Sequence, residues 1–419
     1  MRHPRERSPA GIDRRTFLQR SAAWGAVASA SGLLAACGGG AGSSDSGPTG
    51  LSLASPSNPE TLPLSEDNPA IKSGLEPEAG PLKIYNWSEY IWPRVVKDFV
   101  AEYGVDYEIT SFYNMSEAVN KIRTGRVDFD VFFSTADVVP KLAAAKLLQP
   151  INHDYLGNLK ANIWPELADP WYDKGSRYTV PYAVYTTGIA WRSDMVSEDV
   201  AAMDNPYEVL WNEKYSGKVG IYDDYREAMS MVMLKNGVSD INTGSPKVLA
   251  QVKKELIELS KAVNVKTTID GAWSRLPEGI FALHQSWSGD IVAAPYYMPG
   301  KSYGDPDGVL QYWWPSDGTI GSDMMAIPTG AKNPVLAHHF LNFMLENKYA
   351  LKNFSWVGYQ PPLKSIEPSK LVSDGYVIPN LKPAIVEKPN FSTGVVQTAL
   401  PPTIDRRYQD AWSDFKSGA

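Results

Sequence analysis

The chain has 419 residues, of which 43% are hydrophobic and 21% are charged, a globular composition that excludes a wholly disordered or collagen-like chain. The net charge of −7 gives no electrostatic case for a nucleic-acid partner, and the single cysteine excludes a disulfide framework or a multi-cysteine zinc site. The length predicts two or three domains.

The first 37 residues have the features of an export signal. Arg14-Arg15 forms a twin-arginine pattern, and an apolar run of 16 residues follows it from Ser21 to Ala36. That run is short for a membrane-spanning helix. It ends in small residues just before Cys37 and so resembles a bacterial lipobox, in which the cysteine is lipidated. We expect residues 1–37 to direct twin-arginine export and lipid anchoring; a free cysteine in a disordered leader is the alternative.

Residues 38–80 have the composition of a linker. Glycine, serine and proline make up 22 of these 43 residues, and none is aromatic. Such a segment buries little apolar surface, so we expect a flexible tether and a folded body that begins near Pro81. Without residues 1–36 the chain carries a net charge of −11, which suits a cationic partner but equally serves solubility alone.

The body alternates strand patterns with amphipathic helix patterns. In chain order, the predicted strands are 82–87, 105–112, 129–133, 218–222, 281–287, 309–314 and 324–327. The predicted helices are 92–103, 116–123 with Ser116 as its N-cap, 138–148, 225–234, a long helix that opens at Ser245-Pro246, 334–348 and 401–416. The β-α-β-α-β order at the start favours an α/β fold with a mostly parallel sheet covered by helices.

Motifs of the common enzyme classes are absent from the sequence. There is no G-x-S-x-G, no H-E-x-x-H, no Walker loop and no credible dinucleotide-binding glycine motif. His338 and His339 are adjacent, so on a helix they point in different directions. We therefore expect no catalytic residues, no cofactor and no metal site, although motifs do not exclude a hydrolase that uses carboxylates alone.

Acidic and aromatic residues recur where predicted strands end. These groups are 86–90, 134–137, 223–227, 287–290, 322–323 and 358–360. Ligands of open α/β sheets bind at such ends. Carboxylates would neutralise an alkylammonium ion, while rings cover its methylenes and add about 0.5–2 kcal/mol each of cation–π attraction.

Each of these groups also has a structural interpretation. Asp224 and Glu227 have the spacing of a helix capping box. Glu89 could be an acid in the first turn of a helix, Trp287 a core residue and Asp323 a solvated turn acid.

At these residues the sequence resembles the bacterial spermidine/putrescine-binding proteins of ABC transporters. The motifs are YNWSEY (85–90), FST (133–135), DDYREA (223–228), SWSGD (286–290), SDMMAIPTGAKN (322–333) and VGYQPP (357–362). The resemblance implies a two-domain periplasmic-binding-protein fold with mixed sheets flanked by helices and a ligand cleft between hinged domains. It implies a first domain of 81–188 with 322–367 and a second of 189–321 with 368–419.

The resemblance also implies the ligand contacts. They are Trp87, Ser88, Glu89, Tyr90, Ser134, Asp224, Glu227, Trp287, Asp323, Tyr359 and Gln397. Ala136 and Gly321 stand where the family often has aromatic residues, so we expect a roomier cleft. Candidates to fill the space are Trp313, Trp314 and Tyr185.

The expected function is that of a lipid-anchored solute-binding protein. It would capture polyamines of the spermidine/putrescine class in the periplasm or at the outer face of the cytoplasmic membrane, and deliver them as a monomer to ABC transporter permease subunits. No bond would be made or broken. The alternatives are the same machinery tuned to another small solute, and an extracytoplasmic carboxylate enzyme or sensor.

Overall fold

The computed structural model describes residues 53–125, 128–300, 304–305 and 307–418. The twin-arginine pattern, the apolar run and Cys37 lie outside these ranges. The strands are β1 Leu82–Trp87, β2 Tyr107–Phe112, β3 Val131–Thr135, β4 Thr179–Arg192, β5 Val219–Ile221, β6 Lys266–Thr267, β7 Leu283–Trp287, β8 Leu310–Trp313 and β9 Thr319–Ala326. The helices are α2 Pro93–Tyr103, α3 Met115–Arg123, α4 Val139–Ala144, α5 Gly157–Asn162, α6 Pro165–Ala168, α7 Tyr225–Lys235, α8 Pro246–Val263, α9 Ser288–Ala293, α10 Pro334–Met344, α11 Asn347–Val357, α12 Asn390–Thr393 and α13 Pro402–Ser417.

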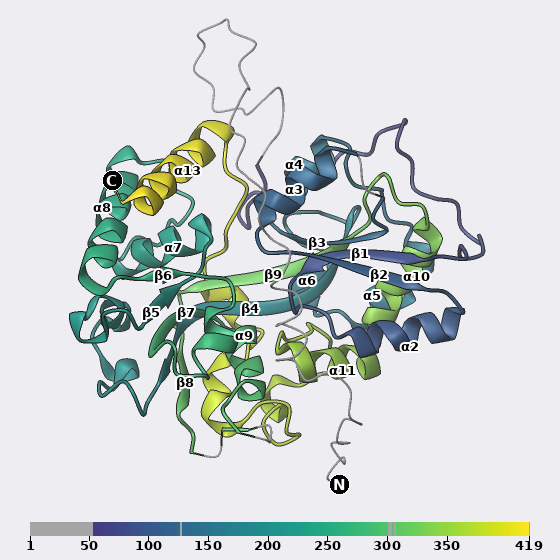
Figure 1. The fold of residues 1–419 in the computed structure, drawn as a ribbon. Coiled ribbons are helices and arrows are strands. Elements are labelled where there is room, and N and C mark those ends of the chain that lie inside the picture. Colours follow the sequence, from purple (N-terminus) through teal and green to yellow (C-terminus); the bar gives the residue numbers. More distant parts are fainter. Residues whose placement is uncertain (1–52, 126–127, 301–303, 306, 419) are drawn as a thin grey trace, which may run out of the picture. The chain divides into compact units, whose positions relative to one another are not determined.

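These strands form one mixed sheet with helices on both faces (Figure 1). The strand order is β2-β1-β3-β9-β4-β7-β5-β6, and β8 pairs with β4. Strands β2, β1 and β3 are parallel, as are β7, β5 and β6, but β9 and β4 run antiparallel to their neighbours. The prediction of a mostly parallel sheet is therefore wrong.

Strands β4 and β9 join the two parallel groups. The first part of β4, Thr179–Thr187, pairs with β9, and its last part, Thr187–Trp191, pairs with β7. Figure 1 shows β4 and β9 side by side through the middle of the sheet. The predicted domain boundaries at 188/189 and 321/322 fall inside these two strands, and the division into domains stays a prediction.

Local sequence signals explain most helix starts. Ser245 precedes α8 and accepts a hydrogen bond from the Val248 N–H. For α3 the predicted cap Ser116 is wrong, because Asn114 caps the helix by accepting from the Glu117 N–H at 2.8 Å. The predicted helix 334–348 is two helices, since the chain leaves α-helical geometry at Leu345 and Glu346 before α11 begins.

Strand β9 is longer than predicted and begins at Thr319 instead of residue 324. Gly321, Ser322 and Asp323 interrupt the apolar pattern, which hides the start of the strand from the sequence. Asp323 therefore lies inside a central strand, where only 5% of its surface is exposed. The interpretation of Asp323 as a solvated turn acid is wrong.

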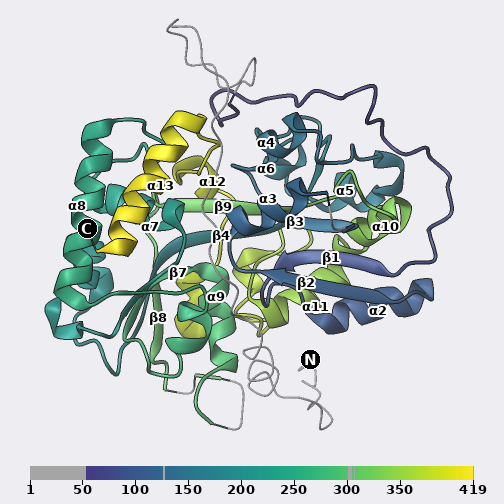
Figure 2. The same ribbon diagram turned by 45° about the horizontal axis from the view of Figure 1, so that its top comes forward.

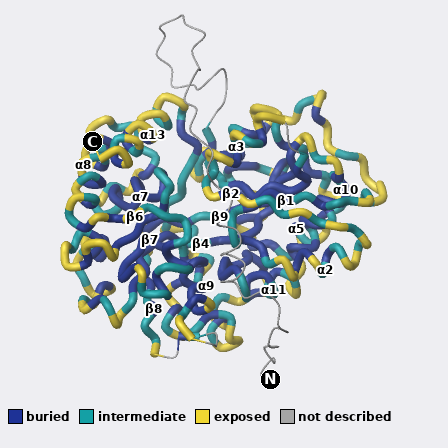
Figure 3. Tube along the Cα trace, in the orientation of Figure 1, coloured by how far each residue is buried: buried dark blue, intermediate teal, exposed yellow. Residues whose placement is uncertain are grey.

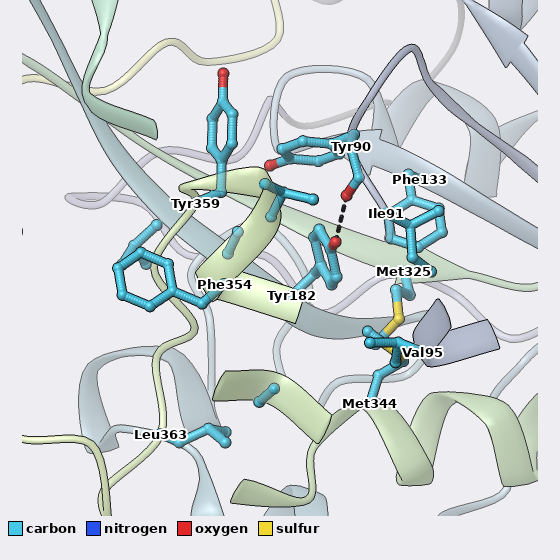
Figure 4. Close-up of a cluster of buried hydrophobic side chains, with 14 of the residues drawn as sticks. Tyr90, Ile91, Val95, Phe133, Tyr182, Met325, Met344, Phe354, Tyr359 and Leu363 are labelled. Carbon is cyan, nitrogen blue, oxygen red and sulfur yellow. Dashed lines mark hydrogen bonds between the residues drawn. The ribbon is translucent and has the colours of Figure 1, made fainter. Parts of the chain in front are cut away.

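Three apolar clusters make up the core. Figure 3 shows that buried residues concentrate along the strands in the interior. The largest packs α2, α10 and α11 beneath β1, β3, β4 and β9. Within it the Tyr182 hydroxyl donates to the Tyr90 carbonyl oxygen, beside Phe133 and Met325 (Figure 4). The second cluster packs α7, α8 and α13 around β5 and β7, and the third covers the other face of β1 and β3. The hydrogen bond from Tyr182 and the packing of the first cluster hold Tyr90 in place.

Residues 53–80 run around the outer edge of the body (Figure 2) and contact it at several points. Leu62 is only 4% exposed and belongs to the third cluster. The Pro63 carbonyl accepts from the Tyr178 hydroxyl at 2.6 Å, and the Asn68 amide donates to the Leu148 carbonyl at 2.8 Å. The segment therefore contacts the body at several points, although most of its residues are exposed, and its division from the body as a flexible tether stays a prediction. We call residues 53–80 the strap.

Candidate ligand-binding site

The carboxylate of Asp323 is buried between two phenols. Its Oδ2 accepts from the Tyr90 hydroxyl at 2.8 Å, and its Oδ1 lies 3.4 Å from the Tyr185 hydroxyl. Burial raises the pKa of Asp323 to about 7, although both phenols act to lower it; the nearby charge of Asp137 raises it further. Each carboxylate oxygen keeps acceptor capacity for one more donor.

A second acidic pair lies at the start of α7. Asp224 is the N-cap, because its Oδ1 accepts from the N–H groups of Arg226 at 2.8 Å and Glu227 at 3.0 Å. The structural interpretation of Asp224 is therefore correct, but Glu227 does not close a capping box. Its Oε1 instead accepts from the Gln397 amide at 3.3 Å. Burial also raises the pKa of Asp224.

Glu227 is buried, with only 5% of its surface exposed. Burial and the Asp224 charge raise its pKa to about 8, while the Trp287 indole and the Thr187 hydroxyl act in the opposite direction. Those two donors lie near the carboxylate but outside normal hydrogen-bond geometry, and Glu227 Oε2 accepts no hydrogen bond from the described residues. This acid therefore has unused acceptor capacity beside an indole ring.

Aromatic rings connect the two acidic centres. Trp287, at the end of β7, lies 6.5 Å from Trp87, at the end of β1, and 6.2 Å from Tyr185 between ring centroids. Tyr359 lies 4.5 Å from Tyr90 and 5.9 Å from Tyr185. Trp87, Trp287 and Tyr185 are half-buried, so the interpretation of Trp287 as a plain core residue is incomplete. Trp87 and Trp287, from the two parallel strand groups, lie close to one another.

Asp290 stands in the predicted group 287–290 but is not among the ligand contacts that the resemblance implies. It is 5% exposed, and its two oxygens accept from the hydroxyls of Tyr222 and Tyr359, each at 2.7 Å. Burial raises its pKa to about 7 despite these two phenols. Tyr222 in turn stacks on Trp287 at 3.7 Å between centroids. The available signal was an acid inside the apolar start of α9, SGDIVA.

For three predicted contacts, Ser88, Glu89 and Ser134, no hydrogen bond named here leads to the acids or rings of this cluster. Ser88 donates its backbone N–H to the Phe112 carbonyl at 3.1 Å. Glu89 has a left-handed φ of 56° and lies before α2, whose first turn holds no acid, so the first-turn interpretation is wrong. Ser134 is fully buried in β3, 3.5 Å from the Thr135 carbonyl. Ligand contact by these residues stays a prediction.

Tyr185, one of the three candidates to fill the space at Gly321, occupies that space. Tyr185 stands directly opposite Gly321 in the β4–β9 ladder. A Cβ on Gly321 would lie 2.5 Å from Cζ of Tyr185, so the tyrosine ring fills that space. Trp313 packs instead on Tyr207 at 5.2 Å, and the Trp314 indole donates to the Thr319 carbonyl at 3.0 Å.

The acids of this site form no close ion pairs with cations among the described residues of the protein, although the charge of the buried Arg226 acts to lower the pKa values of Asp224 and Glu227. Among the described residues, Asp224, Glu227, Asp290 and Asp323 form no ion pair within 4.0 Å. In the same ranges, no three histidine, cysteine or acidic side chains gather in a way that could hold a metal ion. Buried carboxylates of this kind are costly unless a cation accompanies them or they are protonated. The arrangement can bind an organic cation.

Residues 94–379 match the family of bacterial extracellular solute-binding proteins. The chain belongs to that family. A spermidine/putrescine-binding periplasmic protein of Haemophilus influenzae is 28% identical over 305 residues, 71% of this chain and 80% of the relative. A spermidine/putrescine-binding periplasmic protein of Salmonella typhimurium is 28% identical over 67% of this chain and 77% of its own length. A solved structure titled a putative spermidine/putrescine ABC transporter, from Listeria monocytogenes, superimposes with a TM-score of 0.69 at 23% identity, over 80% of this chain and 98% of that one.

These comparisons confirm the family resemblance and the fold class expected from the sequence. They do not test the individual ligand contacts. Within the described ranges, every helix falls short of the length and apolar character needed to cross a bilayer.

Proposed function

We propose that this protein binds a polyamine of the putrescine/spermidine class between Asp323 and the Asp224–Glu227 pair. The observation that carries the proposal is the set of buried carboxylates that form no ion pair within the described residues, with Trp87, Trp287 and Tyr185 near them. Ammonium groups would supply the missing positive charges, and the rings would cover the methylenes between them. The names of the relatives support the same ligand class.

The bound amine would be delivered to the permease of an ABC transporter. Membership of a solute-binding family supports this role, and no chemical step is part of it. The protein would act as a monomer outside the cytoplasmic membrane. It would be exported by the twin-arginine route and held by a lipid on Cys37.

A second candidate is another small cationic solute bound at the same acids. The observation that favours it is the position of the Tyr185 ring over Gly321. The aromatic side chain here comes from β4, whereas the family resemblance implies one at position 321 on β9.

A thermal-shift screen of the full chain separates these candidates. Putrescine and spermidine should raise the melting temperature, and a ligand at 100 times its Kd adds about 2.7 kcal/mol of stability. The control is 1,4-butanediol, which has the length of putrescine without its charges. Stabilisation by an amino acid or a sugar, with none by either amine, would contradict the polyamine proposal.

A further inference from the structure

Tyr185 and Gly321 are coupled by their positions in the sheet. They are direct partners across the β4–β9 ladder. A Cβ built on Gly321 would lie 2.5 Å from Cζ and 2.6 Å from the hydroxyl oxygen of Tyr185, closer than the 3.0 Å that real Cβ atoms keep. The ring of Tyr185 therefore lies across β9 on the glycine. A side chain at 321 and this placement of Tyr185 exclude one another.

The Tyr185 ring also lies close to three other residues of the site: Asp323, Trp287 and Tyr359. Its hydroxyl lies 3.4 Å from Asp323 Oδ1. Its ring centroid is 6.2 Å from that of Trp287, with 68° between the planes, and 5.9 Å from that of Tyr359, with 78° between the planes. Tyr185 as a whole residue is half-buried. Four neighbours thus fix its orientation: Gly321, Asp323, Trp287 and Tyr359.

We infer that Tyr185 is a specificity-determining residue of the site. Gly321, which has no side chain, leaves the space that the Tyr185 ring occupies. This inference rests on the proposed function. Tyr185 is near both Asp323 and Trp287, and Trp287 is near Glu227, so an amine that reaches from Asp323 to Glu227 would pass the Tyr185 ring. The ring then contacts the methylenes next to the Asp323-bound ammonium. Amines of different length lose or gain those contacts unequally.

The first arm of the test needs no ligand. Gly321→Tyr should lower the melting temperature of the ligand-free protein, because the new side chain meets the Tyr185 ring. The swap Tyr185→Gly with Gly321→Tyr should recover at least half of that loss. Tyr185→Gly alone measures the cost of the cavity and of a glycine in the strand. A swap that is no more stable than the sum of its single changes would overturn the mutual exclusion of the two positions.

The second arm measures the ratio of the putrescine and spermidine Kd values by calorimetry. Tyr185→Ala should change this ratio by about tenfold, the order expected when a methylene contact in an apolar pocket is altered. Tyr185→Phe keeps the ring and should keep the ranking of the two amines, with some loss of affinity from the missing hydroxyl. Equal losses for both amines in Tyr185→Ala would overturn the inference while leaving the proposed function intact. If the unsubstituted protein bound neither amine, the proposed function would fail, and the inferred specificity with it.

Discussion

The hydroxyl of Tyr90 donates a 2.8 Å hydrogen bond to Asp323 across 233 residues of sequence. Tyr90 follows β1 and is held from below by Tyr182, while Asp323 lies in the middle of β9. The contact ties the first predicted ligand loop to a central strand. It places an oriented donor on one oxygen of the acid, while the other oxygen has only the longer 3.4 Å contact with the Tyr185 hydroxyl.

Asp323→Asn should weaken putrescine binding by about 2–5 kcal/mol, because one partner of a buried charge pair is lost. Asp173→Asn is a matched control: Asp173 is also a buried acid with a raised pKa, but it accepts from the backbone of Arg177, Tyr178 and Thr179. The control should change the melting temperature more than the Kd. Calorimetry that finds the same Kd for Asp323→Asn and the unsubstituted protein would remove Asp323 from the site.

Stability of the ligand-free protein should fall as pH rises from about 5 to 8.5. Glu227, with a pKa raised to about 8, and Asp323 and Asp290, with pKa values raised to about 7, bind more protons in the folded than in the unfolded chain across this range. The slope of the unfolding free energy with pH is therefore negative there, and it flattens above the folded pKa values.

Thermal unfolding across that pH range checks the sign, and one substitution checks its origin. Glu227→Gln should reduce the slope. Glu255→Gln is the control, because the pKa of this buried acid, which Lys235 pairs at 3.1 Å, is lowered instead. Stability that rises between pH 5.5 and 8.5 would show that the buried acids do not dominate.

Asp290→Asn should become relatively more stabilising as pH rises. Near pH 5 the acid is protonated and, like an amide, offers one donor and acceptor capacity to Tyr222 and Tyr359. Near pH 8 the native protein must hold the carboxylate charge, and the variant has none. The melting-temperature difference, variant minus unsubstituted protein, should therefore increase with pH. A constant difference would mean that Asp290 does not titrate near 7.

Leu62→Ala should cost about 2 kcal/mol or more of the unfolding free energy, because it empties part of a buried cluster. Leu64 is the matched control in the same strap: it is 55% exposed, so Leu64→Ala should stay within about 0.5 kcal/mol. Urea unfolding of both variants decides the matter. Equal effects would mean that the strap is not part of the fold in solution.

Cys37→Ala should release the protein from washed membranes without lowering its melting temperature. The basis is the lipobox-like sequence before Cys37, which lies outside the described residues. Fractionation followed by immunoblotting measures the release. Equal retention of the variant and the unsubstituted protein would contradict the proposed anchor.

Much of the fold could be predicted from hydrophobic periodicity. The first three strands, α7, α8 and α13 have strong local patterns, and the structure confirms them within a few residues. Strand β4 could not be recognised in the same way, because it is buried on both faces and lacks alternation, with Pro181 and Gly188 inside it. Its run of small, apolar and threonine residues also fits a connecting segment.

Site residues that stand in a local motif could be predicted from the sequence. Contacts that depend on pairing between distant segments could not. Asp323, Glu227 and Trp287 stand in recognisable motifs, and the structure brings them together. The contact of Tyr185 with Gly321 depends on strand register over more than a hundred residues, which no local pattern encodes. Asp290 was obscure because its partners, Tyr222 and Tyr359, come from two distant segments.

The central claim is that ammonium groups bind these carboxylates in their ionised form. Calorimetric titration of putrescine into the full chain at pH 6.5 and pH 8.5, in buffers of different ionisation enthalpy, tests it most directly. Putrescine stays protonated at both values, since alkylammonium groups titrate near 10.4. Glu227, with a pKa of about 8, and Asp323, with one of about 7, should release protons on binding at pH 6.5. We predict tighter binding at pH 8.5, proton release at pH 6.5 and no binding of 1,4-butanediol. A pH-independent Kd without proton release, or equal binding of the diol, would contradict the account.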